Sequence, residues 1–75
     1  MTVSIVVPLY NEEDNVKILH EKLQESLERH KIEYEIIFVD DGSNDRTLPL
    51  LEDIQKKNKD ILVLSLRRNF GQTAA

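Results

Sequence analysis

Three short apolar segments constrain the fold more than any other feature of the sequence. They lie at residues 3–9, 34–40 and 61–66 and are rich in Val, Ile and Leu. Segments of this length and composition predict strands that are buried on both faces, as in a parallel sheet. Longer amphipathic stretches separate them. The alternation predicts an α/β fold, a three-layer, right-handed parallel β-α-β-α-β unit.

The first amphipathic stretch predicts a helix over roughly residues 13–30, because apolar side chains recur there at three- and four-residue spacing. We expect Asn11 to cap this helix and the acidic residues 12–14 to favour the positive end of its dipole. His20 and His30 have charged neighbours, which predicts solvated surface positions.

The second amphipathic stretch predicts a helix that begins near residues 45–47, because Pro49 fits only a first helical turn. The helical pattern ends within residues 56–60, where lysines and Asn58 predict the C-terminus of this helix. The final letters "QTAA" predict the start of a third helix. We therefore expect residues 1–75 to be the amino-terminal part of a longer protein, with uncovered sheet edges that promote self-association.

Composition limits the class of protein. The 75 residues allow one small domain, and 32% charged residues with a net charge of −4 are typical of a globular chain without a basic surface for nucleic acid. The absence of cysteine excludes a disulfide framework. The apolar opening is shorter than the about 20 residues that span a bilayer. We expect the piece itself to be soluble and to face the cytosol.

Acidic segments follow the first two predicted strands: "PLYNEE" and "DDGSND". Ligands of open parallel sheets bind beyond the carboxyl ends of the strands. The first turn contains no glycine, unlike a dinucleotide site, and its acids would repel a bare phosphate. We therefore expect these carboxylates to accept hydrogen bonds from the ribose hydroxyl and base N–H groups of a nucleotide.

Alternatives exist for individual residues at this edge. One carboxylate of the pair Asp40 and Asp41 is expected to turn toward amides of the following loop, where Gly42 eases the turn. Asp45 fits a helix cap better than a ligand. Tyr10 offers a ring face for a base, but it also fits the rim of the core.

The motifs "VSIVVPLYNEEDNV" and "IIFVDDGSNDRT" resemble the start of the inverting family 2 glycosyltransferases, which have the GT-A fold. "SLRRNFGQTAA" is similar to their polyprenyl-phosphate and dolichol-phosphate branch. The resemblance covers essentially the whole chain. It implies transfer of a sugar from a UDP- or GDP-sugar to a polyprenyl phosphate, with Mg²⁺ or Mn²⁺ bridging the diphosphate, at the cytoplasmic face of a membrane.

The resemblance also implies roles for particular residues. Arg67 and Arg68 fall where a positive charge would hold phosphate. The metal-binding Asp-x-Asp segment and the acid that activates the acceptor should follow residue 75, so we expect no catalytic or metal-binding residue here and no activity from this piece alone. Asp41 is the best single candidate for a nucleotide contact. The residues that match the nucleotide-sugar site are Pro8, Tyr10, Glu12, Asp40, Asp41 and Ser43.

Two rival functions remain open. A receiver-like signalling domain also binds Mg²⁺ with an acidic pair, but it needs a third acid after the third strand, where this chain reads "SLRRN". The nucleotide-binding half of an oxidoreductase would use Asp40 on a ribose, but it needs the Gly-x-Gly-x-x-Gly turn. A structural interaction domain would bind no nucleotide at all.

Overall fold

The computed structural model describes residues 2–66, in which strands and helices alternate. The elements are β1 (Thr2–Leu9), α1 (Val16–Arg29), β2 (Glu33–Asp40), α2 (Thr47–Lys57) and β3 (Ile61–Ser65). The three predicted strands are confirmed, and each boundary falls within one residue of its predicted position. The third helix and the two arginines expected near phosphate lie outside the described residues.

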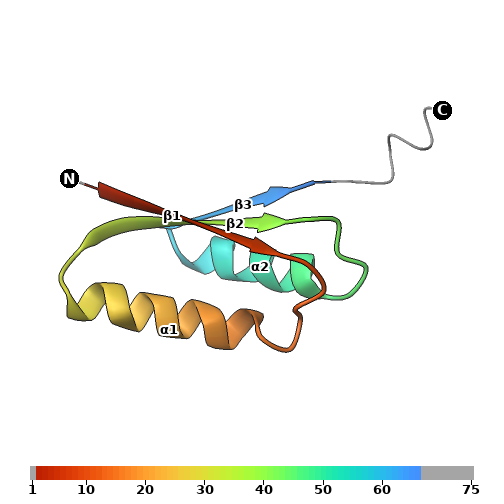
Figure 1. Ribbon diagram of the computed structural model, residues 1–75, viewed down its shortest axis with the longest axis horizontal. Helices are drawn as coiled ribbons and strands as arrows, with labels where there is room; N and C mark the ends of the chain where they lie inside the picture. The colour runs from red at the N-terminus through yellow and green to blue at the C-terminus, as the bar shows by residue number, and fades with distance from the viewer. Residues whose placement is uncertain (1, 67–75) are drawn as a thin grey trace.

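The strands form one parallel sheet in the order β1-β2-β3, so β2 is central. Figure 1 shows that α1 and α2 lie on the same face of this sheet. The predicted α/β class is confirmed, and the described residues supply two layers of it, a sheet and a layer of helices. All three strands end at the same edge, which places the segments that follow β1 and β2 next to each other.

The core lies between the sheet and the two helices. Alternate residues of each strand point into it, as a half-covered sheet requires. Ile36 and Phe38 on β2 are fully buried, and Val16 of α1 and Leu51 of α2 cover them. Each such side chain contributes about 1.5–3 kcal/mol relative to an exposed position. The remaining members of the buried cluster are Leu9, Leu27 and Ile61.

Among residues 2–66, no helix lies over the opposite face of the sheet (Figure 1), and apolar side chains of the strands are exposed there. Val6, Ile37 and Leu62 form one row across the three strands, and Val39 and Leu64 lie in the row beyond. Val6 is 61% exposed and Leu64 is 48% exposed. We call these five residues the open sheet face. Parallel sheets are usually covered on both faces, so this surface is unusual for an isolated chain.

The start of α1 differs from the prediction. Asn11 does not cap the helix, and the acids of 12–14 precede it, because α1 begins only at Val16 with Asn15 as its N-cap residue. The backbone turns first: Asn11 adopts a left-handed conformation with φ of 50°. The carbonyl of Glu12 then accepts the N–H groups of Asn15 and Val16.

The boundaries of α2 agree with the prediction. The helix begins at Thr47, which places Pro49 in its first turn. Asn58 ends it, and its side-chain amide donates to the carbonyl of Ile54 at 2.9 Å.

His20 contradicts its predicted surface position. The side chain is only 8% exposed and its ring meets the ring of Phe38 edge-on, with centroids 6.5 Å apart. The reason is spacing: His20 lies four residues after Val16 and seven before Leu27, on the buried stripe of α1. Desolvation lowers the pKa of His20, and the nearby charge of Glu21 only partly opposes this shift. His30 is exposed, as expected.

Candidate functional site

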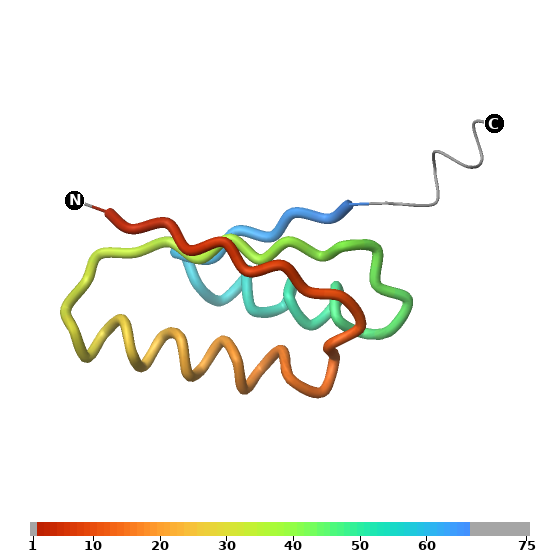
Figure 2. The backbone as a smooth tube through the Cα atoms, in the orientation of Figure 1, coloured from red at the N-terminus to blue at the C-terminus, as the bar shows by residue number. Residues whose placement is uncertain are grey.

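The candidate site lies at the carboxyl edge of the sheet, where two loops follow β1 and β2. We call residues 10–15 the first rim loop and residues 41–46 the second rim loop. Leu9 pairs with Asp40 at the end of the sheet, and the Asp41 N–H donates to the Leu9 carbonyl at 2.9 Å. Tyr10 and Asp41 therefore leave the sheet side by side. Figure 2 shows both loops at the same end of the molecule.

Asn11 joins the two rim loops at their exposed side. Its N–H donates to Ser43 Oγ at 2.8 Å, and its side-chain Oδ1 accepts the N–H of Asn44 at 2.8 Å. Asparagine tolerates the left-handed backbone that this geometry needs better than most residues do. Gly42, with φ of 80°, makes the corresponding turn in the second rim loop.

Thr47 joins the loops at their inner side. The fully buried hydroxyl accepts the N–H of Glu12 at 2.8 Å and donates its own proton to Asp45 Oδ1. Asp45 Oδ2 also accepts the N–H of Glu13 at 3.3 Å. Backbone groups of the first rim loop are thus satisfied by side chains that lie more than thirty residues further along the chain.

Two carboxylates occupy the amino terminus of α2. Asp45 Oδ1 accepts the N–H of Thr47 at 2.9 Å, and Glu13 Oε1 accepts the N–H of Arg46 at 2.9 Å. These acids satisfy amides that a helix start leaves without partners, and their charge complements the helix dipole. A phosphate at this helix end would meet carboxylates rather than free amides.

The electrostatics of Asp45 fit this structural role. Desolvation raises its pKa, but hydrogen bonds from the Thr47 hydroxyl, the Thr47 amide and the Glu13 amide outweigh that effect and leave the pKa below its usual value. The ionised form is therefore the one that the fold stabilises.

The adjacent acids Asp40 and Asp41 have different environments. Asp40 is 1% exposed, and its Oδ2 accepts the N–H of Ser43 at 3.3 Å. Its Oδ1 is buried with no hydrogen-bond partner among residues 2–66. Asp41 is partly exposed. As predicted, one carboxylate of the pair turns toward an amide of the following loop, and that carboxylate is Asp40.

The other residues predicted for the site also lie at this edge. Pro8 is exposed and pairs with Val39 near the end of β1. Tyr10 is 49% exposed, which leaves much of its side chain accessible to a ligand. Glu12 is partly exposed, and its Oε1 accepts a hydrogen bond from the Asn15 side chain at 2.9 Å.

Two acids of this edge have structural roles at the start of α2. The predicted capping role of Asp45 is confirmed, whereas Glu13, which was predicted to favour the dipole of the first helix, instead accepts the N–H of Arg46 at the start of α2. Sequence reasoning missed Asn11 and Thr47 as the residues that join the two loops. Their partners lie on a different loop, so no local pattern in the sequence could have identified these contacts.

A metal does not fit the described part of the site. Within residues 2–66, no three His, Asp or Glu side chains are grouped so that they could hold an ion.

A shallow hollow lies at the opposite edge of the sheet, beside Tyr34 and Asp60, and is remote from the rim loops. Neither α1 nor α2 is long and apolar enough to cross a membrane.

These features define a parallel α/β unit whose candidate ligand site is a glycine-poor, acidic carboxyl edge. The chain belongs to glycosyl transferase family 2, because that family's pattern matches residues 4–75. The predicted family is thereby confirmed. The receiver and oxidoreductase alternatives gain no support.

Similar proteins agree with this family. An uncharacterized glycosyltransferase of Synechocystis is 51% identical over 72 residues, which cover 96% of this chain and 23% of that protein. An undecaprenyl-phosphate 4-deoxy-4-formamido-L-arabinose transferase of Pectobacterium atrosepticum is 43% identical over 74 residues, 97% of this chain and 23% of its own length. The Proteus mirabilis transferase of the same name is 39% identical, with the same coverage. The chain therefore spans less than a quarter of the relatives it matches.

Proposed function

We propose that this chain is the amino-terminal, nucleotide-binding part of a longer glycosyltransferase, which moves a sugar from a UDP- or GDP-sugar to a polyprenyl phosphate. The family match over residues 4–75 carries the proposal. The acceptor class is supported by the relatives whose names specify undecaprenyl phosphate.

The nucleoside end of the donor is the part that this site suits. Asp41 is a partly exposed carboxylate next to Tyr10, whose side chain is half exposed. A carboxylate accepts hydrogen bonds from base N–H or ribose hydroxyl groups, and an aromatic ring packs against a base. We assign these contacts to Asp41 and Tyr10, with Glu12 and Pro8 at the same edge of the sheet.

Asp40 and Ser43 support the site from beneath in this proposal. Asp40 is too deeply buried to be approached without a rearrangement, and its bond to the Ser43 amide shapes the turn that presents Asp41. Their contribution is then to the conformation of the second rim loop.

The diphosphate end of the donor requires groups that residues 2–66 do not provide. The amides at the start of α2 already bind Glu13 and Asp45, and no cluster of acids is placed to hold an ion. We propose that the ligands for Mg²⁺ or Mn²⁺, and the acid that activates the acceptor, lie beyond residue 75.

Location and assembly are part of the same proposal. A polyprenyl phosphate acceptor implies that the enzyme acts at a membrane, and we propose that the whole enzyme lies at the cytoplasmic face of that membrane. The outer edges of β1 and β3 have no partner strand among residues 2–66, and the open sheet face is apolar. Both features favour self-association of the 75-residue chain when it is isolated.

Transferase assays test the proposed function. The full-length protein, supplied with undecaprenyl phosphate, Mn²⁺ and a panel of UDP- and GDP-sugars, should form a glycolipid with one of these donors. The 75-residue chain should form none. Robust turnover by the short chain would contradict the proposal that the metal ligands and the activating acid lie beyond residue 75. A full-length protein that neither turns over a donor nor binds a nucleotide would contradict the proposed function.

A further inference from the structure

Tyr10 and Asp41 lie within a ring that is formed by two stretches of backbone and closed by two hydrogen bonds, one of them to the Ser43 side chain. One side of the ring is formed by residues 9–11 and the other by residues 41–43. The Asp41 N–H closes it at the sheet by donating to the Leu9 carbonyl, and the Asn11 N–H closes it at the outer end by donating to Ser43 Oγ. Both residues that we assign to the nucleoside therefore lie between two hydrogen bonds.

We propose that Asn11 is a positioning residue of the nucleotide site, because it locks the first rim loop to the second and so fixes Tyr10 relative to Asp41. This proposal rests on the proposed function. Asn11 accepts the N–H of Asn44 as well as donating to Ser43, so a single residue makes both outer contacts.

The exposure of Asn11 indicates a positional role more than a stabilising one. Its two hydrogen bonds are exposed to solvent, and hydrogen bonds that compete with water add little to overall stability. Asn11 also does not cap α1, since Asn15 occupies that position. What remains for its side chain is the contact between the loops.

Three substitutions of Asn11 separate the effect of its left-handed backbone conformation from the effect of its side-chain hydrogen bond. Asn11→Gly keeps the left-handed conformation accessible but removes the acceptor for the Asn44 amide. Asn11→Asp keeps an acceptor and tolerates the same conformation. Asn11→Ala loses the acceptor and also disfavours a φ of 50°.

A matched control lies at the other end of α2. Asn58→Gly removes another asparagine side-chain bond, the one to the Ile54 carbonyl, at the opposite edge of the sheet. It should lower the thermal midpoint without changing nucleotide affinity. This control separates a loss of positioning from a general loss of stability.

The experiment measures Kd for UDP and GDP by calorimetry, and KM and kcat for the donor, in the full-length protein and these four variants. We expect Asn11→Gly to raise Kd about 2- to 10-fold, and Asn11→Ala at least as much, with Asn11→Asp within about twofold of the wild type. KM should rise with Kd, while kcat changes less.

Two results would overturn the positioning role while leaving the proposed function intact. The first is a wild-type Kd in Asn11→Gly. The second is an equal loss of affinity in Asn58→Gly. A wild-type protein that binds neither UDP nor GDP would instead overturn the proposed function, and the positioning role with it.

Discussion

The two edges of the sheet are built in different ways. At the carboxyl edge, five hydrogen bonds join the first rim loop to the second rim loop and the start of α2, and each links residues at least 32 positions apart. At the amino edge, the turn after α1 closes on itself through backbone bonds such as Ile32 N–H to the Leu27 carbonyl. Figure 2 shows the turn after α1 at the end opposite to the rim loops. The turn after α1 is closed by local hydrogen bonds, whereas the carboxyl edge fixes two loops in a defined relation, as a binding site requires.

Thr47 provides the strongest test of this difference. Thr47→Val keeps the shape of the buried side chain but leaves the Glu12 amide without its acceptor. We expect it to lower the free energy of unfolding by about 1–3 kcal/mol. Thr47→Ser keeps the hydroxyl and should cost under about 1 kcal/mol. Urea unfolding of both variants checks this, and a Thr47→Val protein as stable as the wild type would remove the distinction between the edges.

His20 in α1 and His30 at its C-cap test the comparison through the pH dependence of stability. The pKa of His20 is lowered by desolvation, so the unfolded chain binds a proton more readily than the folded one. Stability should therefore be full above the unfolded pKa of about 6.5 and decrease as the pH falls below it toward the folded value.

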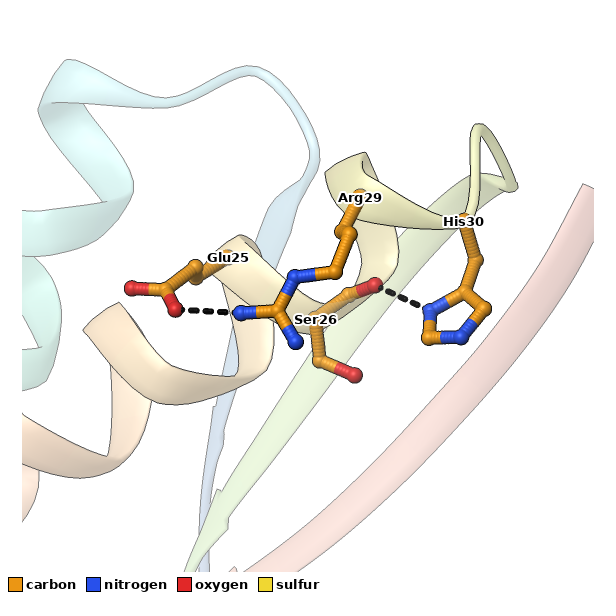
Figure 3. A network of polar contacts seen from close by, with 4 residues as sticks. All are labelled: Glu25, Ser26, Arg29 and His30. Carbon is orange, nitrogen blue, oxygen red and sulfur yellow. Dashed lines mark hydrogen bonds and ion pairs between the residues drawn. The ribbon is translucent and has the colours of Figure 1, made fainter.

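Unfolding free energies measured between about pH 7.5 and pH 5.5 check this expectation. The decrease should be smaller in His20→Gln and unchanged in His30→Gln. His30 is exposed at the amino edge, where its Nδ1 lies 2.8 Å from the Ser26 carbonyl oxygen (Figure 3). An equal reduction in both variants would show that burial of His20 is not the cause.

Arg29 should give the smallest effect. Its guanidinium lies 2.6 Å from Glu25, but both side chains are about two-thirds exposed or more, at 67% and 72% (Figure 3). Exposed pairs of this kind contribute little, so Arg29→Ala should change the free energy of unfolding by under about 0.5 kcal/mol. Thermal unfolding at low and high salt measures it. A loss as large as that of Thr47→Val would mean that the amino edge also depends on side-chain contacts.

The three strands and their alternation with helices could be predicted from the sequence, because short Val- and Ile-rich segments leave few alternatives for a buried strand. The start of α2 was equally clear, since Pro49 restricts where a helix begins. These signals are local, and tertiary contacts do not override them.

The predictions that Asn11 caps α1 and that His20 is a solvated surface residue are wrong for two different physical reasons. Asn11 has the chemistry of a helix cap, but its conformation is set by Ser43 and Asn44 on another loop. The capping role of Asp45 could be predicted because its amide partner Thr47 is two residues away, whereas the amide partner of Glu13 lies 33 residues away on another loop. For His20, the spacing with Val16 and Leu27 indicates a buried position, although the polarity of histidine and its charged neighbours favours a surface one.

The most direct test of the central claim is a titration of the full-length protein with UDP and GDP in the presence of Mn²⁺, comparing Asp41→Ala with Asp60→Ala. Asp60 is an acid at the amino edge and serves as the control. We expect Asp41→Ala to weaken binding of the preferred nucleotide about 10- to 100-fold, as the loss of a hydrogen bond to a charged group would. Asp60→Ala should stay within about twofold. Equal affinity in all three proteins would contradict a nucleotide site at the carboxyl edge.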